Sequence, residues 1–268
     1  MINKVVVSKV IKEDYENLIF FLEHFYSDRP EKNWSSRIEY WWDKNPSFNH
    51  NCIRGAKLVD QTDNKIIGFI GLIPLKLKLK SSIVIAYAFT SWRVHEEYRK
   101  HSLELLYFLD NLLADKICFN YTANQIAKFY FKKLKFEKIT NGTINSYFYF
   151  NNTFFNRIFL KYKIPILGSF VDLFFEIFQN FSIKKFKNHK INIIYQTKDF
   201  SDINTLWVNT NSAITCVERN SDFLEWLNSN PTRNLYTVNV YSSDAILAYM
   251  TFTMVNGKYR KLICSDYW

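Results

Sequence analysis

The sequence predicts a mixed α/β protein in which two related α/β units follow in tandem, each with a mixed central sheet flanked by helices. Strand-like and helix-like segments alternate, and 48% of the 268 residues are hydrophobic, enough for a sizeable core. The segment 38–46 (IEYWWDKNP) is echoed at 223–231 (FLEWLNSNP), where Trp-x-x-x-Asn-Pro recurs. Two strand-like segments follow each copy. Such an internal repeat is typical of a duplicated unit.

Hydrophobic patterning predicts the elements of the first unit. Runs of β-branched and other apolar residues predict strands at 5–10, 57–60, 66–73, 75–80 and 83–94. The last run is almost continuously apolar, as in a central strand. Apolar residues at helical spacing predict helices at 13–25 and 37–42, the second of which ends before Pro46. The polar segment 26–37 is expected to be a loop.

The second unit has fewer elements and ends earlier in the pattern. Strands are expected at 191–196, 235–241 and 245–254, helices at 202–209 and around Trp226, and a last strand up to Trp268. We place a first domain at 1–150, a helical interdomain segment at 151–190 and a partial second domain at 191–268. Charged residues and Pro165 interrupt the apolar stretch 153–181, so no transmembrane segment is expected, and a membrane-surface role stays an alternative.

Two strand-to-helix junctions of the first unit are suited to bind phosphate. The segment 94–102 (VHEEYRKHS) follows the central strand, and 124–127 (NQIA) opens a later helix. Unpaired backbone N–H groups and the positive end of the helix dipole hold phosphate oxygens at such positions. The junctions predict a site for a nucleotide-bearing cofactor, and the second unit ends before any equivalent of residues 98–102.

Charge and cysteine content bound the partners and the compartment. Lys and Arg number 35 against 25 Asp and Glu, a net charge of +10 that favours anionic partners such as nucleotides. The charge is spread along the chain, so nucleic acid is not expected as the main partner. The four cysteines form no CxxC pair and lie in apolar runs, and the N-terminus lacks a leader pattern. We expect a cytoplasmic protein with reduced cysteines and no metal.

Residues 57–136 resemble the GCN5-related N-acetyltransferase superfamily, and the tandem layout resembles the related Fem-type nonribosomal peptidyltransferases. The resemblance rests on Val94 at the end of the central strand, on the turn from Arg99 to Glu104, and on a helix with Asn124, Ala127 and Phe131 that ends at Phe136. It implies that the turn binds the pyrophosphate of coenzyme A and that backbone groups near Trp92 pair with the pantetheine. The implied cofactor-binding residues are Ser91, Trp92, Arg93, Val94, Arg99, Lys100, His101, Ser102, Leu103, Asn124 and Phe131.

Three positions depart from the family pattern. Ser102 and Glu104 stand where the family has small residues, and Lys135 stands where it has glycine. Phe131 occupies the register of the tyrosine that protonates the departing thiolate in many family members, and Tyr130 precedes it. Tyr130 is therefore the candidate acid, although it points about 100° away from that face of the helix.

The general base stays open among several residues. Glu39, Asp266 and His95 are the candidates. As alternatives without a catalytic role, Glu39 faces solvent on its helix, Asp266 ends a strand, and His95 lies beside the pyrophosphate. A base must lie within hydrogen-bond reach of the amine. Proton removal by water is the remaining alternative.

Aromatic and basic residues of 34–44 form the candidate acceptor site, since the resemblance implies that this segment covers the acceptor. Trp34, Arg37 and Tyr40 are the predicted substrate-binding residues, with Lys44 as a further cation for phosphate. Trp41 is instead expected in the core because its echo, Trp226, recurs in the other unit. Trp34, expected in the polar loop, is the better ligand candidate.

The leading hypothesis from the sequence is a cytosolic N-acyltransferase that uses acyl-CoA and a small anionic amine acceptor. The resemblance implies a nucleotide-linked amino sugar, such as a dTDP-linked amino-dideoxyhexose, in the biosynthesis of surface polysaccharide such as O-antigen. The acyl group is acetyl or larger, for example 3-hydroxybutanoyl, and no covalent enzyme intermediate is expected. The alternatives are a Fem-type aminoacyl-tRNA-dependent transferase and a non-catalytic binding module. The oligomeric state stays open.

Overall fold

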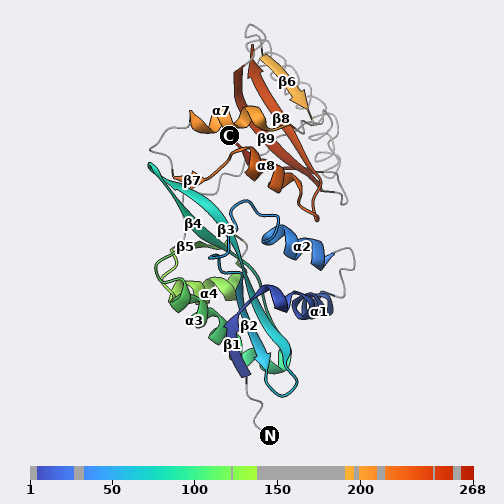
Figure 1. The fold of residues 1–268 in the computed structure, drawn as a ribbon, viewed down its shortest axis with the longest axis vertical. Coiled ribbons are helices and arrows are strands. Elements are labelled where there is room, and N and C mark those ends of the chain that lie inside the picture. Colours follow the sequence, from blue (N-terminus) through green and yellow to red (C-terminus); the bar gives the residue numbers. More distant parts are fainter. Residues whose placement is uncertain are drawn as a thin grey trace, which may run out of the picture. The chain divides into compact units, whose positions relative to one another are not determined.

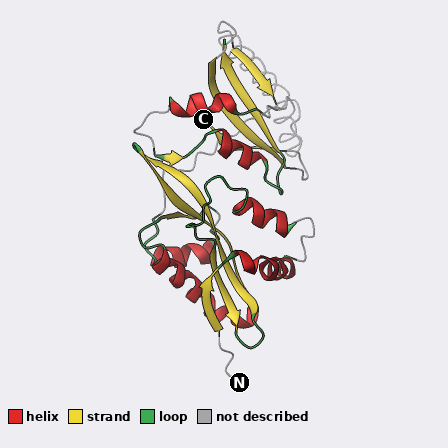
Figure 2. Cartoon of the chain, viewed as in Figure 1, coloured by secondary structure: helices red, strands yellow, loops and turns green. Residues whose placement is uncertain are grey.

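A computed structural model describes residues 5–26, 33–121, 123–137, 191–195, 199–209, 215–243, 245–255 and 261–268. The expected helical segment 151–190 lies outside these residues. Within them the chain is a mixed α/β protein, as predicted (Figures 1 and 2).

Most of the described first half forms one sheet. Its strands are β1 (Val5–Lys9), β2 (Gly55–Asp60), β3 (Lys65–Leu79), β4 (Ser82–Val94) and β5 (Ile117–Phe119), in the order β1-β2-β3-β4-β5. Neighbours are antiparallel except β4 and β5, which are parallel. A short strand from the second half, β7 (Cys216–Val217), pairs with the end of β3. The sheet is therefore mixed, and β4 is an inner strand.

Helices cover both faces of this sheet (Figure 1). One face carries α1 (Tyr15–Phe25), which follows the 3-10 turn η1 (Lys12–Asp14), and α2 (Trp34–Trp41). The other face carries α3 (Ser102–Leu112), which follows the 3-10 turn η2 (Glu96–His101), and α4 (Gln125–Lys133). Each face encloses its own buried apolar cluster. Burial of these clusters is the main force that holds the helices on the sheet.

Two differences from the sequence prediction affect the candidate site. The strands expected at 66–73 and 75–80 are one continuous strand, β3, because Pro74 is tolerated within it. Helix α2 begins at Trp34 rather than Arg37, since the side chain of Asn33 accepts a hydrogen bond from the N–H of Ser36 and caps the helix. Trp34 is thus a helical residue and not part of a loop.

The Trp-x-x-x-Asn-Pro segment fixes the end of α2 on the sheet. The indole Nε1 of Trp42 donates to the carbonyl oxygen of Leu72 at 2.8 Å, and Asn45 Nδ2 donates to the carbonyl oxygen of Pro74 at 2.9 Å. Both side chains are buried. Strand β2 pairs with β3 only as far as Gly71, so it offers no donor to the carbonyl oxygens of Leu72 and Pro74. The side chains of Trp42 and Asn45 supply these hydrogen bonds instead, since buried polar groups need a partner.

The second half contains β6 (Ile191–Tyr195), α7 (Ser201–Val208), α8 (Ser221–Asn228), β8 (Leu235–Ser242), β9 (Ala245–Val255) and β10 (Lys261–Tyr267). Strands β10, β9 and β8 are neighbours in a second sheet.

The chain divides into two compact units, one of Met1–Phe136, Tyr195–Asn239 and Ala248–Trp268 and one of Glu137–Ile194 and Val240–Leu247. The domain boundaries at 150 and 190 stay a prediction.

Candidate functional site

Strand β4 contains a β-bulge near its C-terminal end. Phe69 of β3 pairs with Arg93, and Gly71 pairs with Thr90, so Ser91 and Trp92 together oppose the single residue Ile70. Ser91 has a φ of 49°, in the left-handed region that few non-glycine residues adopt. A bulge leaves backbone groups outside the regular ladder and redirects side chains. The backbone around Ser91 is therefore shaped differently from the rest of the strand.

Strands β4 and β5 separate just before this bulge. They pair at Ala86–Ile117, Tyr87–Cys118 and Ala88–Phe119, where β5 ends, while β4 continues to Val94. Within the described chain, no strand lies beside this last part of β4 on the side of β5. An open strand edge offers backbone donors and acceptors to an extended ligand.

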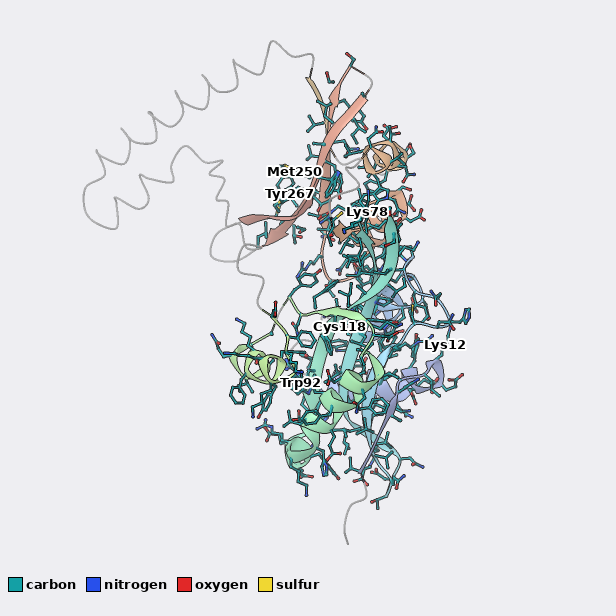
Figure 3. All side chains as sticks on the ribbon, turned by 90° about the vertical axis from the view of Figure 1, so that its left-hand side faces the viewer. Lys12, Lys78, Trp92, Cys118, Met250 and Tyr267 are labelled. Carbon is teal, nitrogen blue, oxygen red and sulfur yellow. The ribbon has the colours of Figure 1, made fainter. Side chains whose placement is uncertain are left out.

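The side chain of Trp92 projects from the bulge toward α4 (Figure 3). Its ring meets Tyr130 at 6.2 Å and Phe131 at 6.1 Å in edge-to-face contacts. The indole Nε1 is buried without a hydrogen-bond partner in the described part of the chain. Phe131 is buried against Phe89. We call Trp92, Tyr130 and Phe131 the aromatic wall; it lies beside the part of β4 that β5 no longer covers. The candidate acid Tyr130 is thus part of the aromatic wall.

The turn after β4 is helical from Glu96 onward. The Ser102 N–H already bonds to the carbonyl oxygen of Arg99, and none of residues 95–104 has a positive φ. Arg99 pairs with Glu96 at 2.5 Å, and His101 Nδ1 lies 2.7 Å from Glu104. The first turn of α3 begins at Ser102, so the N–H groups from Leu103 onward are the ones at its positive end.

The remaining cofactor-binding candidates lie around this turn. Lys100 is exposed and has no ion pair among the residues that the structure describes, and Val94 is buried below the turn. Asn124 caps α4, because its Oδ1 accepts from the Ala127 N–H at 2.8 Å. Asn124 therefore orients the helix that carries Tyr130 and Phe131.

Two candidate bases already have partners. Glu39 pairs with Lys44 at 2.8 Å. Asp266 accepts hydrogen bonds from Nε of Arg219 at 3.0 and 3.1 Å, from Nη2 of Arg219 at 2.9 Å and from the hydroxyl of Tyr249 at 2.6 Å. Burial and the charge of Asp266 raise the pKa of Tyr249 far above its usual range. Asp266 is thus held in a structural network of the second half.

His95 is placed differently. Its ring stacks with His24 at 6.2 Å and meets Phe25 edge-on at 6.1 Å, on the side of α1. The Nδ1 atom is buried with no hydrogen-bond partner in the described residues. Glu39 and Asp266 already have partners, whereas Nδ1 of His95 forms no hydrogen bond within the described residues.

The predicted acceptor residues are more buried than expected. Trp34 is 2% exposed and Tyr40 is 6% exposed, and the guanidinium of Arg37 lies 5.0 Å from the ring of Trp34 and 5.2 Å from that of Trp41. Trp41 is in the core, as predicted. Stacking of a base on Trp34 would require Arg37 or Tyr26 to move, since both cover its ring. Arg37 remains partly exposed.

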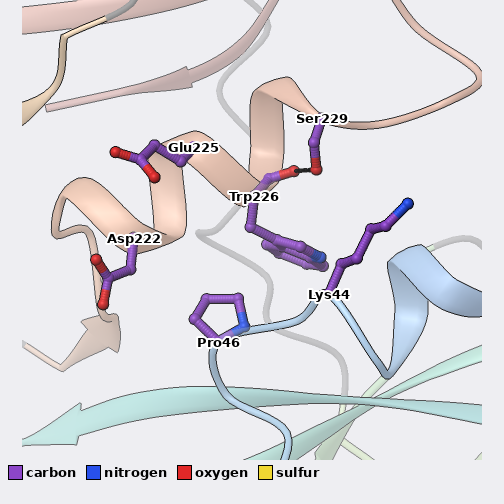
Figure 4. A pocket seen from close by; sticks show the side chains of 6 residues that line it. All are labelled: Lys44, Pro46, Asp222, Glu225, Trp226 and Ser229. Carbon is purple, nitrogen blue, oxygen red and sulfur yellow. Dashed lines mark hydrogen bonds between the residues drawn. The ribbon is translucent and has the colours of Figure 1, made fainter.

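A shallow cavity of about 360 Å³ lies beside α8 and is lined by Lys44, Pro46, Asp222, Glu225, Trp226 and Ser229 (Figure 4). Two of the lining residues are carboxylates, and Lys44 is paired with Glu39. The carboxylates of Asp222, Glu225 and Glu39 would repel a phosphate bound at Lys44. This cavity therefore does not suit the phosphate that we expected Lys44 to bind.

The sequence did not single out Tyr26, Arg233 or the side chain of Arg93. The guanidinium of Arg93 lies 5.2 Å from the ring of Tyr26. Tyr26 ends α1 and Arg233 lies in a turn, so neither position has a periodic signal. Among the described residues, no cluster of three or more His, Cys, Asp or Glu could hold a metal, and no helix is long and apolar enough to cross a membrane.

Comparison with known proteins gives similarity in structure alone. No protein-family model and no curated protein matches the sequence. A probable N-acyltransferase from Enterococcus faecalis aligns with a TM-score of 0.55 and 11% identity, covering 95% of this chain and 56% of that one. A GCN5-related N-acetyltransferase from Anabaena variabilis aligns with a TM-score of 0.56 and 13% identity, covering 98% and 58%.

The yeast N-myristoyltransferase with bound myristoyl-CoA aligns with a TM-score of 0.47 and 11% identity, covering 100% of this chain and 63% of that one. The chain thus spans less than two thirds of the length of these three structures. The alignments with the Enterococcus faecalis and Anabaena variabilis structures show that the chain has the fold of the GCN5-related N-acetyltransferases.

Proposed function

We propose that the protein is an N-acyltransferase that moves an acyl group from acyl-CoA to a primary amine. The observation that carries the proposal is the bulge at Ser91 and Trp92, which lies directly beyond the point where β4 and β5 separate. This position combines an open strand edge, irregular backbone groups and an aromatic wall. It supports binding of an extended pantetheine with its thioester at the bulge.

The residues present fit coenzyme A. The edge of β4 from Phe89 to Val94 can pair with the pantetheine amides, and the ring of Trp92 packs beside this edge against Tyr130 and Phe131. Lys100 and the first turn of α3 can bind the phosphates. The fit is weaker at the turn, because Glu96 pairs with Arg99 and the carboxylate of Glu104 lies beside His101.

The acyl thioester supplies an activated carbonyl carbon. The amine nitrogen bonds to this carbon, the C–S bond breaks, the amine loses a proton, and the thiolate takes one up. Backbone N–H groups at the bulge would stabilise the negative charge on the carbonyl oxygen. Tyr130 would protonate the thiolate. We favour His95 as the proton acceptor, because Glu39 and Asp266 already accept from Lys44 and Arg219.

The proposed acceptor is a nucleotide-linked amino sugar used for surface polysaccharide. Support comes from the family resemblance and from the net charge of +10, which favours an anionic acceptor. An acyl group larger than acetyl is compatible with the aromatic wall of Trp92 and Phe131.

A thiol-release assay tests this reaction. Acetyl-CoA and 3-hydroxybutanoyl-CoA are incubated with dTDP- and UDP-linked amino sugars, and free coenzyme A is titrated with a thiol reagent. We expect release that depends on the free amine. The N-acetylated forms of the same sugars are the matched controls, since they lack the nucleophile. Equal release with both forms would mean hydrolysis and would contradict amine transfer.

A further inference from the structure

The side chain of Tyr98 ties the turn after β4 to the end of β2. Its hydroxyl donates to Oδ2 of Asp60 at 2.5 Å, across 38 positions of the chain. Asp60 is the last residue of β2 and is 5% exposed. The other carboxylate oxygen of Asp60 accepts from the N–H of Thr62 at 2.9 Å. The phenol thus reaches from η2 to a carboxylate that the β2–β3 turn already holds in place.

Asp60 is a rigid and charged acceptor for this phenol. It is paired in the sheet on both sides, with Val5 of β1 and with Lys65 of β3. Hydrogen bonds from Tyr98 and then from Thr62 hold the pKa of Asp60 below its usual range, so the side chain is ionised at neutral pH. A hydrogen bond to a carboxylate is about twice as strong as one between neutral groups. The contact therefore fixes the phenol firmly to the sheet.

The turn η2 relies on Tyr98 for its place over the sheet. Within η2, Tyr98 is half-buried and packs against the buried cluster that includes residues of α3 and α4. A short 3-10 turn has poorly aligned hydrogen bonds of its own and is easily displaced. The exposed residues of η2 are Glu96, Glu97, Arg99 and Lys100.

Tyr98 also lies between the two proposed chemical groups of the site. Its N–H donates to the carbonyl oxygen of His95 at 2.9 Å, and its ring meets the imidazole of His95 edge-on, with centroids 6.3 Å apart. Further along the same turn, Ser102 begins α3. A shift of Tyr98 would therefore move the start of α3, where the phosphates are proposed to bind.

We propose that Tyr98 is a positioning residue for coenzyme A, whose bond to Asp60 holds η2 and the first turn of α3 where the phosphates bind. The proposal rests on the proposed function, because it takes the phosphates to lie at the start of α3. Tyr98 acts through the backbone N–H groups from Leu103 onward and need not touch the ligand itself. Hydrogen bonds weaken steeply when donor and acceptor are misaligned, so a displaced turn binds phosphate less tightly.

Calorimetric titration of coenzyme A into the full chain tests the proposal. Tyr98→Phe removes only the hydroxyl, and we expect the affinity for coenzyme A to fall about 10-fold. The double variant Tyr98→Phe/Asp60→Asn should bind about as Tyr98→Phe does, because the bond between the two side chains is already lost. It also removes the buried carboxylate that has lost its donor, so it serves as the folded variant where Tyr98→Phe is unstable.

Two controls separate positioning from a general loss of structure. Pantetheine has no pyrophosphate, so its binding, followed by tryptophan fluorescence, should be equal in Tyr98→Phe and the wild type. Tyr15→Phe removes another phenol that donates to a carboxylate, that of Asp43 at 3.2 Å, and Tyr15 packs against the other buried cluster. This variant should bind coenzyme A as the wild type does.

Three results would overturn the positioning role. The first is equal affinity of Tyr98→Phe and the wild type for coenzyme A, and the second is an equal loss of affinity for coenzyme A and for pantetheine. Both leave the proposed function intact. The third is a wild type that does not bind coenzyme A, which would overturn the proposed function together with the positioning role.

Discussion

The indole Nε1 of Trp226 donates a 2.7 Å hydrogen bond to the carbonyl oxygen of Tyr40, a residue 186 positions earlier. The two rings also stack almost in parallel, at an angle of 8°. A buried donor that reaches the last turn of α2 joins the repeated segment of the second half to its counterpart in the first. This contact holds α8 of the second half against α2.

Trp226→Phe tests the strength of this contact. The variant keeps an aromatic ring but leaves the Tyr40 carbonyl oxygen without its donor, so unfolding free energy should fall by about 1–3 kcal/mol. Urea denaturation measures the loss. Trp42→Phe is the matched variant, because it removes another buried hydrogen bond from an indole, the one that Trp42 donates to the carbonyl oxygen of Leu72 in β3. An unchanged stability of Trp226→Phe would show that the contact does not stabilise the fold.

Alkaline unfolding should report the burial of Tyr40. Burial raises the pKa of Tyr40 from 10.0 to about 12, so the folded protein holds this proton more tightly than the unfolded chain does. The stabilisation is complete below pH 10 and is lost as pH rises to about 12. Tyr40→Phe should remove about 2 kcal/mol of the pH dependence over this window. Identical slopes for the variant and the wild type would contradict the assignment.

Gly71→Ala should disturb the bulge. A Cβ at Gly71 would lie 2.7 Å from Cγ2 of Thr90 and 2.9 Å from Phe69, beside the irregular pair of β3 and β4. Displacement of β4 there should weaken coenzyme A binding about 10-fold, because ligand pairing requires a fixed backbone. Thr90→Ser removes the nearest methyl group and should restore part of the affinity. If Gly71→Ala binds coenzyme A with wild-type affinity, the bulge is not needed for cofactor binding.

The strands and the order of elements were readable from the sequence, because apolar runs such as 83–94 and the Asn-Pro ends are local signals. The cap at Asn33 was missed, and with it the burial of Trp34, since a polar segment before an aromatic cluster reads as a loop. The basic turn was found, but not its ion pairs with Glu96 and Glu104. The contact of Trp226 with Tyr40 could not be predicted, because it depends on the packing of α8 against α2.

Calorimetric titration of coenzyme A into the wild type, Ser102→Glu and Ser102→Gln tests the central claim most directly. Ser102 begins α3, at the proposed phosphate end of the cofactor. We predict saturable binding to the wild type, a loss of about 10-fold or more in Ser102→Glu from charge repulsion, and near wild-type affinity in Ser102→Gln, which adds similar bulk without charge. No binding to the wild type, or equal affinity for all three proteins, would contradict a coenzyme A site at this end of β4.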